Sequence, residues 1–366
     1  MTEVIASEES EKPKQSPVPR SIGRSLWAAA PGLLGKYGLV LAFAVVMLVF
    51  TWLAPKTFLG PINMKNTLTF QSVTALLALA VMLPLATNEF DLSLGYHVGM
   101  AQVLVIGLQV NQNLSWEVAV LIVLLVGLLV GTVNAILVTR FHINSFIATL
   151  GSGMLLYAIS NWYTGGMQIV PSSLPEPFTG MVGQIAGIPI PALVVVALSV
   201  VLWLVLERTV PGRGLYVIGS SRRAAELTGI SIPKHVGAAF IGCGVITGLA
   251  GVFLGSMLRT GTASEGPEFL LPALAGALLG ATSIHPGRVN VIGTLVAVLI
   301  LAFAFSGVQQ LGAPFYTQYL FNGGILIVAV GLSGYASRRN VLAAARRAPV
   351  ATDEPPDQQP SPAAEA

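Results

Sequence analysis

Long apolar segments separated by short polar ones make up most of the chain between residues 36 and 335. A helix needs about 20 mainly apolar residues to cross ~30 Å of hydrocarbon. The pattern predicts ten such runs, at 37–54, 67–86, 94–110, 116–138, 145–163, 189–206, 236–258, 270–284, 290–308 and 319–335. The runs at 94–110 and 270–284 are short and interrupted by Gly, His or Pro, so we expect tilted, broken or re-entrant helices there. The sequence therefore predicts an all-α membrane protein, a polytopic bundle of about ten transmembrane helices.

Polar segments flank this region at both ends. Residues 1–35 contain four prolines, and residues 336–366 have no apolar period. We expect both segments to be cytoplasmic tails that are largely disordered. The apolar core of a secretory signal would lie closer to Met1, which favours an uncleaved first span. The predicted organisation is thus one transmembrane domain at 36–335, which contains a cytoplasmic loop at 207–235.

The composition agrees with a membrane protein and excludes several other classes. The chain of 366 residues is 54% hydrophobic and 10% charged, whereas soluble domains carry roughly 25% charged residues. Its positive residues are scattered among loops rather than gathered in one patch, so no nucleic-acid partner is expected. The single cysteine, Cys243, excludes an internal disulfide and a cysteine-based metal site. We expect no metal and no bound cofactor.

Lysine and arginine residues concentrate in alternate loops. If the N-terminus is cytoplasmic and all ten runs span, sixteen of the 19 lysines and arginines face the cytoplasm. The exceptions are Lys56, Lys65 and Arg259. Cytoplasmic loops carry such an excess. We therefore predict a multi-pass protein of the cell membrane with both termini in the cytoplasm.

The longest predicted cytoplasmic loop, at 207–235, contains the polar sequence GSSRRAAELTGI. Ser220 or Ser221 can cap a helix start, residues 222–227 favour a helix, and Gly229 can end it in the left-handed conformation. Such a two-turn helix is marginal in water on its own. We therefore expect it to pack against something.

Two interpretations of this short helix remain open. It can be a connector that rests on its own protein and is rich in arginine because cytoplasmic loops are. Alternatively, it can be a docking element for a cytoplasmic partner. In that case the small Ala224 and Ala225 allow close contact, and polar bonds come from Arg222, Arg223 and Glu226.

The stretch LYVIGSSRRAAELTGI resembles the cytoplasmic coupling segment of bacterial ABC importer permeases of the ribose/xylose/galactose type. Matching positions are Tyr216, Ile218, Gly219, Ala224, Ala225, Gly229 and Ile230. Segments 89–95, 144–166 and 278–300 resemble further segments of this family, in the same order. Glu89 replaces a glycine that is common there. The resemblance covers about residues 40–335.

This resemblance implies a permease subunit that works as a homodimer in a bacterial plasma membrane. Its partners would be a cytoplasmic ATP-binding subunit and an extracytoplasmic solute-binding protein. The solute would be small and polar, most simply a monosaccharide, with purine nucleosides or a furanose signalling molecule as other candidates. The residues expected to couple the permease to the ATPase are Tyr216, Gly219, Arg222, Arg223, Ala224, Ala225, Glu226 and Gly229.

The chain itself is not expected to be an enzyme. It contains no G-x-x-x-x-G-K-[ST] sequence that could cradle ATP, so ATP hydrolysis would belong to a separate chain. The alternative function is a secondary transporter or channel for a small polar solute. Ion-coupled carriers usually bury ionisable residues near the midplane, and the middles of the long runs hold none.

Polar residues in or near the apolar runs are candidates for the solute pathway. We single out Asp91, Ser93, His97, Thr149 and Asn161. Asp91 or Ser93 can instead cap the helix that begins near residue 94, and a lone histidine is more often structural. The hydroxyl and amide groups suit sugar hydroxyls, but bonds between helices require the same groups.

Overall fold

We describe the fold from a computed structural model, which describes residues 22–314, 316–324, 327 and 331. The long helices are α1 (Ile22–Leu53), α2 (Pro61–Ala86), α3 (Leu94–Val110), α4 (Trp116–Thr139), α5 (Ser145–Thr164), α7 (Ile190–Trp203), α10 (Ile232–Leu258), α11 (Leu270–Gly280) and α12 (Val291–Gln310). Each expected run from 37–54 to 290–308 coincides with one of them, which confirms the all-α bundle. The tenth run, 319–335, lies partly outside the described residues.

Helix length and composition identify the membrane spans. Among the described residues, α2, α4, α10, α12 and the continuous segment Ile190–Arg208 are long and apolar enough to cross a membrane. That segment joins α7 to the π-helical turn η2 (Leu204–Arg208). The run at 94–110 forms the short but uninterrupted helix α3.

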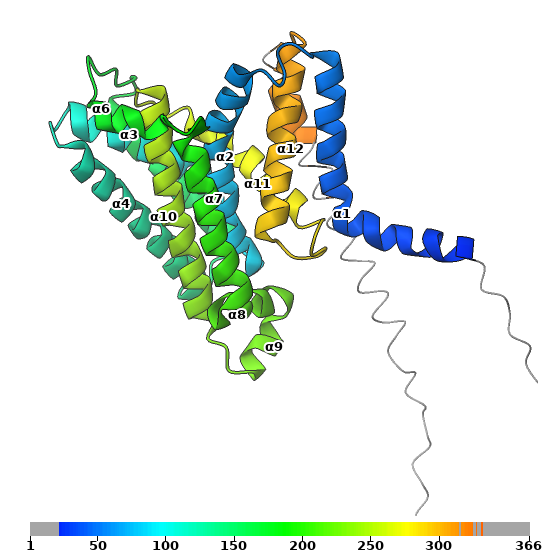
Figure 1. The fold of residues 1–366 in the computed structure, drawn as a ribbon. Helices are drawn as coiled ribbons and strands as arrows, with labels where there is room; N and C mark the ends of the chain where they lie inside the picture. Colours follow the sequence, from blue (N-terminus) through cyan, green and yellow to red (C-terminus); the bar gives the residue numbers. More distant parts are fainter. Residues whose placement is uncertain (1–21, 315, 325–326, 328–330, 332–366) are drawn as a thin grey trace, which may run out of the picture.

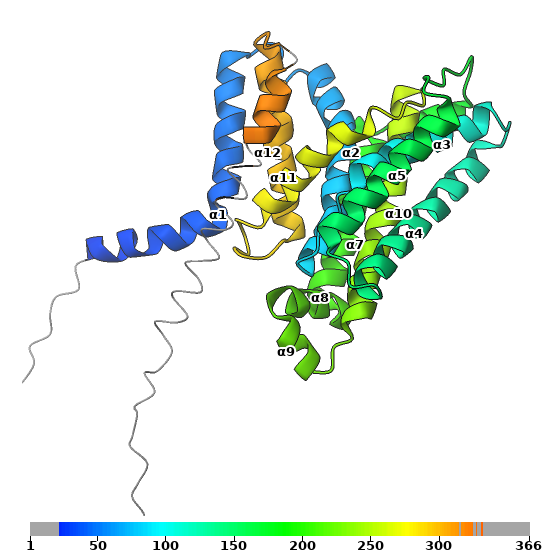
Figure 2. The ribbon, with the colours of Figure 1, turned by 180° about the vertical axis from the view of Figure 1, so that it is seen from behind.

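The first helix begins earlier than the apolar pattern indicates. α1 starts at Ile22, inside the segment 1–35 that the sequence predicts to be a tail. Residues 26–30 read LWAAA, and alanine and leucine have high helix propensity, which accounts for the earlier start. Figures 1 and 2 show this first part of α1 projecting sideways, away from the bundle, before the helix turns and runs beside α12. Residues 1–21 and 332–366 lie outside the described part.

Short elements mark the two ends of the bundle (Figure 1). At one end lie α6 (Glu176–Thr179), the 3₁₀ turn η1 (Gly180–Val182) and the antiparallel pair β1 (Gln184–Ile185) and β2 (Ile188–Pro189), in which Gln184 pairs with Pro189. At the opposite end lie α8 (Val210–Ser220) and α9 (Arg222–Leu227). The predicted cytoplasmic loop therefore forms its own pair of helices.

Glycine residues allow the closest helix crossing. A Cβ on Gly244 of α10 would collide with the Gly127 carbonyl oxygen of α4, and one on Gly131 would come 2.5 Å from the Phe240 carbonyl oxygen. Small residues let membrane helices approach in this way. α10 also packs against α2 and α3, so these helices enclose the core of the bundle.

A break in the chain precedes α11. Residues 259–269 run back into the bundle without forming an α-helix, and Ile169 and Gly261 exchange two backbone hydrogen bonds of 2.9 Å. Gly266 then lies against Gly95 and Gly99 of α3, where a Cβ would collide with backbone. The turn η3 (Gly266–Phe269) leads into α11. Irregular backbone at membrane depth is tolerated only where protein buries it or a wet cavity adjoins it.

Candidate functional site

The helix predicted within GSSRRAAELTGI forms as expected. The Ser221 hydroxyl accepts a hydrogen bond of 3.2 Å from the Ala224 backbone N–H, which caps the start of α9. Gly229 follows the helix with φ = 75°, a conformation that glycine adopts without strain. Local sequence therefore determines where α9 begins and ends.

One side of α9 packs against the protein itself. Ala225 is fully buried in a cluster with Ile218, Val236 and Phe240. The Ile230 backbone N–H also donates to the Ala225 carbonyl over 2.9 Å. Ala225 thus anchors the helix and is not available to a partner.

The other side of α9 is exposed and forms what we call the α9 tip: Arg223, Ala224, Glu226 and Leu227. Leu227 is 74% exposed, and Arg223 and Glu226 form a 3.4 Å ion pair beside it. An apolar side chain between charged neighbours is a typical centre of an interface. The sequence analysis missed Leu227, although its place one turn after Arg223 could have indicated it.

Two contacts connect α8 and α9 to the α2–α3 loop (residues 87–93). Arg222 forms an ion pair with Glu89, whose side chain is 11% exposed. A Cβ on Gly219 would collide with the Ala86 carbonyl oxygen, so α8 approaches the end of α2 very closely. The replacement of a glycine by Glu89 was visible in the sequence, but its partner 133 residues away was not.

The α2–α3 loop continues into a buried network of polar side chains. Asp91 accepts hydrogen bonds from the Ser93 backbone N–H over 3.0 Å and from its hydroxyl over 2.5 Å. The Asn134 amide of α4 donates to the Ser93 hydroxyl over 2.9 Å and accepts from Ser152 of α5 over 2.7 Å. Asp91 thus orients Ser93, which precedes α3, but Ser93 forms no side-chain hydrogen bond that caps the helix.

Thr149 of α5 joins the same region. Its hydroxyl accepts from the Leu92 backbone N–H over 2.9 Å, and the Ser145 hydroxyl accepts from the Phe90 N–H over 3.1 Å. Asp91, Ser93 and Thr149 therefore lie together and hold the α2–α3 loop against α4 and α5. Because these hydrogen bonds link the loop to α4 and α5, they position helices.

Of the two remaining pathway candidates, His97 lies one turn after Ser93, to whose carbonyl its backbone N–H donates over 2.8 Å, and Asn161 lies apart. Buried His97 has no hydrogen-bond partner for its Nε2 atom among the described residues. The Asn161 amide donates to the Tyr157 carbonyl of its own helix over 2.9 Å. Asn161 lies twelve residues beyond Thr149, about 18 Å along the axis of α5. The structure therefore does not bring all five candidates to one site.

A second set of contacts surrounds Arg288, in the loop between α11 and α12. Its guanidinium donates to both carboxylate oxygens of Glu207, over 2.7 and 2.9 Å. It also lies 4.3 Å from the ring centroid of Tyr216 on α8. Burial, together with the nearby Glu207 carboxylate, raises the pKa of Tyr216 to about 12, against the opposing effect of Arg288. Tyr216 is therefore neutral at physiological pH and is held within the protein.

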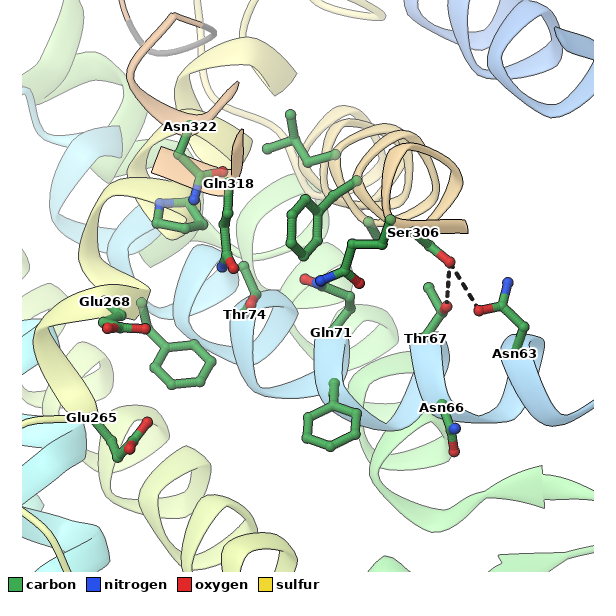
Figure 3. A pocket seen from close by; sticks show the side chains of 17 residues that line it. Asn63, Asn66, Thr67, Gln71, Thr74, Glu265, Glu268, Ser306, Gln318 and Asn322 are labelled. Atoms are coloured by element: carbon green, nitrogen blue, oxygen red, sulfur yellow. Dashed lines mark hydrogen bonds between the residues drawn. The ribbon is translucent and has the colours of Figure 1, made fainter. Parts of the chain in front are cut away.

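A polar cavity of about 470 Å³ opens near the end of the bundle opposite α9, and we call it the α2–α12 cavity (Figure 3). It extends along α2 from Asn63 to Thr74, about 16 Å at 1.5 Å per residue, and so reaches the middle of that helix. Its lining consists of Asn63, Asn66, Thr67, Phe70, Gln71, Thr74, Glu265, Glu268, Phe269, Pro272, Leu301, Ala302, Phe305, Ser306, Gln309, Gln318 and Asn322.

Sequence reasoning missed this cavity although part of its signal was present. On α2 the lining residues recur at i, i+3, i+4, i+7, i+8 and i+11 from Asn63, which places them on one helical face. The predicted run began at residue 67 and so left out the first polar turn. Among the described residues, no group of three or more His, Cys, Asp or Glu could hold a metal ion.

Comparison with known proteins shows which family and which relatives the chain resembles. Residues 63–330 match the family described as branched-chain amino acid transport system / permease component. The ribose import permease protein of Bacillus subtilis strain 168 is 30% identical over 300 residues, which cover 82% of this chain and 92% of that protein. The Escherichia coli K12 ribose import permease is 29% identical over 302 residues, 80% and 91% of the two chains. The autoinducer 2 import system permease protein of Escherichia coli SMS-3-5 is 28% identical over 305 residues, 81% and 92% of the two chains. No solved structure matches the chain.

Proposed function

Because the chain belongs to the branched-chain amino acid transport system permease family, we propose that it forms the pathway by which an ABC importer carries a monosaccharide into a bacterial cell. The membership confirms the resemblance to ABC importer permeases and makes the chain a multi-pass transport subunit rather than an enzyme. The proposal concerns the solute, the assembly and the direction of transport.

The observation that carries the proposal is the connection between α9 and the α2–α3 loop. The exposed α9 tip offers Leu227 and two charged side chains to a partner. Next to the tip, Arg222 forms an ion pair with Glu89 of the α2–α3 loop. Farther along the same loop, Ser93 is hydrogen-bonded to Asp91 and to Asn134 of α4. A partner that pulls or pushes α9 therefore acts directly on the junction of α2, α3 and α4. An ATPase subunit docked on the α9 tip would use this connection.

The relatives and the α2–α12 cavity support a sugar as the solute. The relatives are named for ribose and for autoinducer 2, whereas the family description refers to branched-chain amino acids. The cavity lining is rich in amides and hydroxyls, which bind sugar hydroxyls as donors and acceptors. This lining favours a polyhydroxylated solute over an aliphatic amino acid. Autoinducer 2 is the second candidate.

The expected topology supports the proposal for the remaining partners. The excess of lysine and arginine in alternate loops favours a cytoplasmic α9, with both termini on the same side. A solute-binding protein would then deliver solute to the opposite end, where the α2–α12 cavity opens. A second copy of the permease would complete the pathway in a homodimer.

Reconstitution in liposomes tests this function. The permease is combined with its ATPase and binding proteins, and uptake of labelled D-ribose is measured with ATP supplied on the α9 side. We expect uphill uptake that disappears when the ATPase carries an inactivating substitution. Uphill uptake by the permease alone, driven by a proton or sodium gradient, would instead establish a secondary transporter.

A further inference from the structure

The α2–α12 cavity contains two carboxylates that lie beside the apolar, membrane-spanning helix α2. Glu265 and Glu268 lie in the break that precedes α11, and they line the cavity opposite α2 (Figure 3). The Tyr319 hydroxyl donates to Glu268 over 2.9 Å. Among the described residues neither carboxylate forms an ion pair, and the lining contains no Lys, Arg or His. Glu265 is half-buried and Glu268 is exposed, and carboxylates beside membrane-spanning helices usually serve a function.

Hydrogen-bonding groups of the cavity divide into two sets. The polar groups of one wall are hydrogen-bonded to one another. The Thr67 hydroxyl donates to Ser306 over 3.1 Å, and Ser306 donates to Asn63 over 3.0 Å. The other groups include Thr74, which lies farther along α2 and is 4% exposed. The Thr74 hydroxyl is thus a polar group of the cavity wall at its deep end, near the middle of α2.

The backbone explains why the carboxylates reach the cavity. Gly266 fits against Gly95 and Gly99 of α3, so the irregular segment 259–269 passes into the bundle rather than over it. Interrupted helices place binding groups near the middle of many transporters. The cavity volume of about 470 Å³ falls within the range of small-molecule sites.

We propose that the α2–α12 cavity is a solute-binding site of the permease itself, which accepts neutral or cationic polyhydroxylated solutes and excludes anionic ones through Glu265 and Glu268. The carboxylate oxygens accept hydrogen bonds from solute hydroxyls or ammonium groups. Their uncompensated negative charge repels a phosphate or carboxylate. This inference rests on the proposed function in one respect, namely that the solute is small and polar.

Direct binding to the purified full-length permease in nanodiscs tests the site. The probes are D-ribose, D-glucosamine and D-ribose 5-phosphate, and saturation-transfer NMR detects weak binding. We expect saturable binding of the first two and none of the phosphate. In Glu265→Gln/Glu268→Gln, binding of D-glucosamine should weaken about tenfold or more, since a hydrogen bond to a charged group contributes roughly 1.5–3 kcal/mol. The phosphate should then begin to bind.

Matched variants show whether the charge preference belongs to this cavity. Glu117→Gln removes an exposed carboxylate at the first turn of α4, outside the cavity, and should change nothing. Thr74→Val should weaken D-ribose binding without altering the preference between neutral and anionic probes. Melting temperatures confirm that each variant folds.

Three results would overturn the inference. The first is no saturable binding of any probe. The second is the same preference in the wild type and the double glutamine variant. The third is a double variant that alters the oligomeric state but leaves binding unchanged, which would make the cavity an interface between copies. ATP-driven uptake in liposomes is measured separately, so failure of the proposed function appears as lost uptake and not as altered probe preference.

Discussion

The ion pair between Glu89 and Arg222 can be reversed to test whether α9 acts on the membrane helices. The Arg222 side chain is 53% exposed, whereas that of Glu89 is 11% exposed. Exposed pairs contribute about 0.2–1 kcal/mol, and two charges 4 Å apart interact by about 4 kcal/mol at an effective dielectric of 20. A pair that is buried on one side lies between these limits, so we expect a coupling energy of about 1–2 kcal/mol. That energy corresponds to a five- to thirtyfold change in an equilibrium constant.

The assay compares Arg222→Glu, Glu89→Arg and the double exchange in the reconstituted complex. Each single variant places like charges together, so α9 should separate from the α2–α3 loop. Solute transported per ATP hydrolysed should then fall about five- to thirtyfold, while the melting temperature of the bundle changes little. The double exchange restores opposite charges and should recover most of the coupling.

Arg223 provides the control on the same helix. It is 80% exposed and its partner is Glu226, so Glu89→Arg should not rescue Arg223→Glu. The reasoning fails if Arg222→Glu transports as much solute per ATP as the wild type. It also fails if the double exchange performs no better than the worse of its two parents.

Three further predictions concern stability and local order. Tyr216→Phe removes a buried hydroxyl that has no partner among the described residues, so the free energy of unfolding should stay the same or rise by up to about 1 kcal/mol. The folded-state pKa of Tyr216 is raised to about 12, so wild-type stability should fall as pH rises from about 10 to 12. Melting temperatures measured across this range should fall less steeply in the variant. Gly244→Val should lower the free energy of unfolding by about 1–3 kcal/mol through overpacking, whereas Gly151→Ala, with no atom within 4 Å of the added Cβ, should be neutral or slightly stabilising. Asn134→Leu leaves the hydrogen-bond partners of Asn134 unpaired, and each buried group left unpaired costs about 1–3 kcal/mol of stability. Because the α2–α3 loop is then held less firmly, backbone hydrogen exchange should accelerate at residues 90–93.

The apolar pattern predicted the helices because each depends on local sequence. A run of about 20 apolar residues is enough to indicate a span, and the ends of α9 follow from Ser221 and Gly229, which lie beside it. The same reasoning could not pair Glu89 with Arg222, since the partner of a charged side chain depends on how distant helices cross. Nor could it assign Ala225 to the protein interior, because a small residue suits a buried contact and a docking surface equally well.

Local sequence predicts only one wall of the α2–α12 cavity. One of its walls, from Asn63 to Thr74, could have been found by testing the polar residues of the second run for helical spacing. The opposite wall could not, because Glu265 and Glu268 follow an apolar run and resemble an ordinary polar loop in sequence. They reach the middle of the bundle only because Gly266 fits against two glycines of α3, about 170 residues earlier in the chain. A larger residue at position 266 should therefore move both carboxylates away from α2, and solute selectivity should be lost even though every residue that lines the cavity is unchanged.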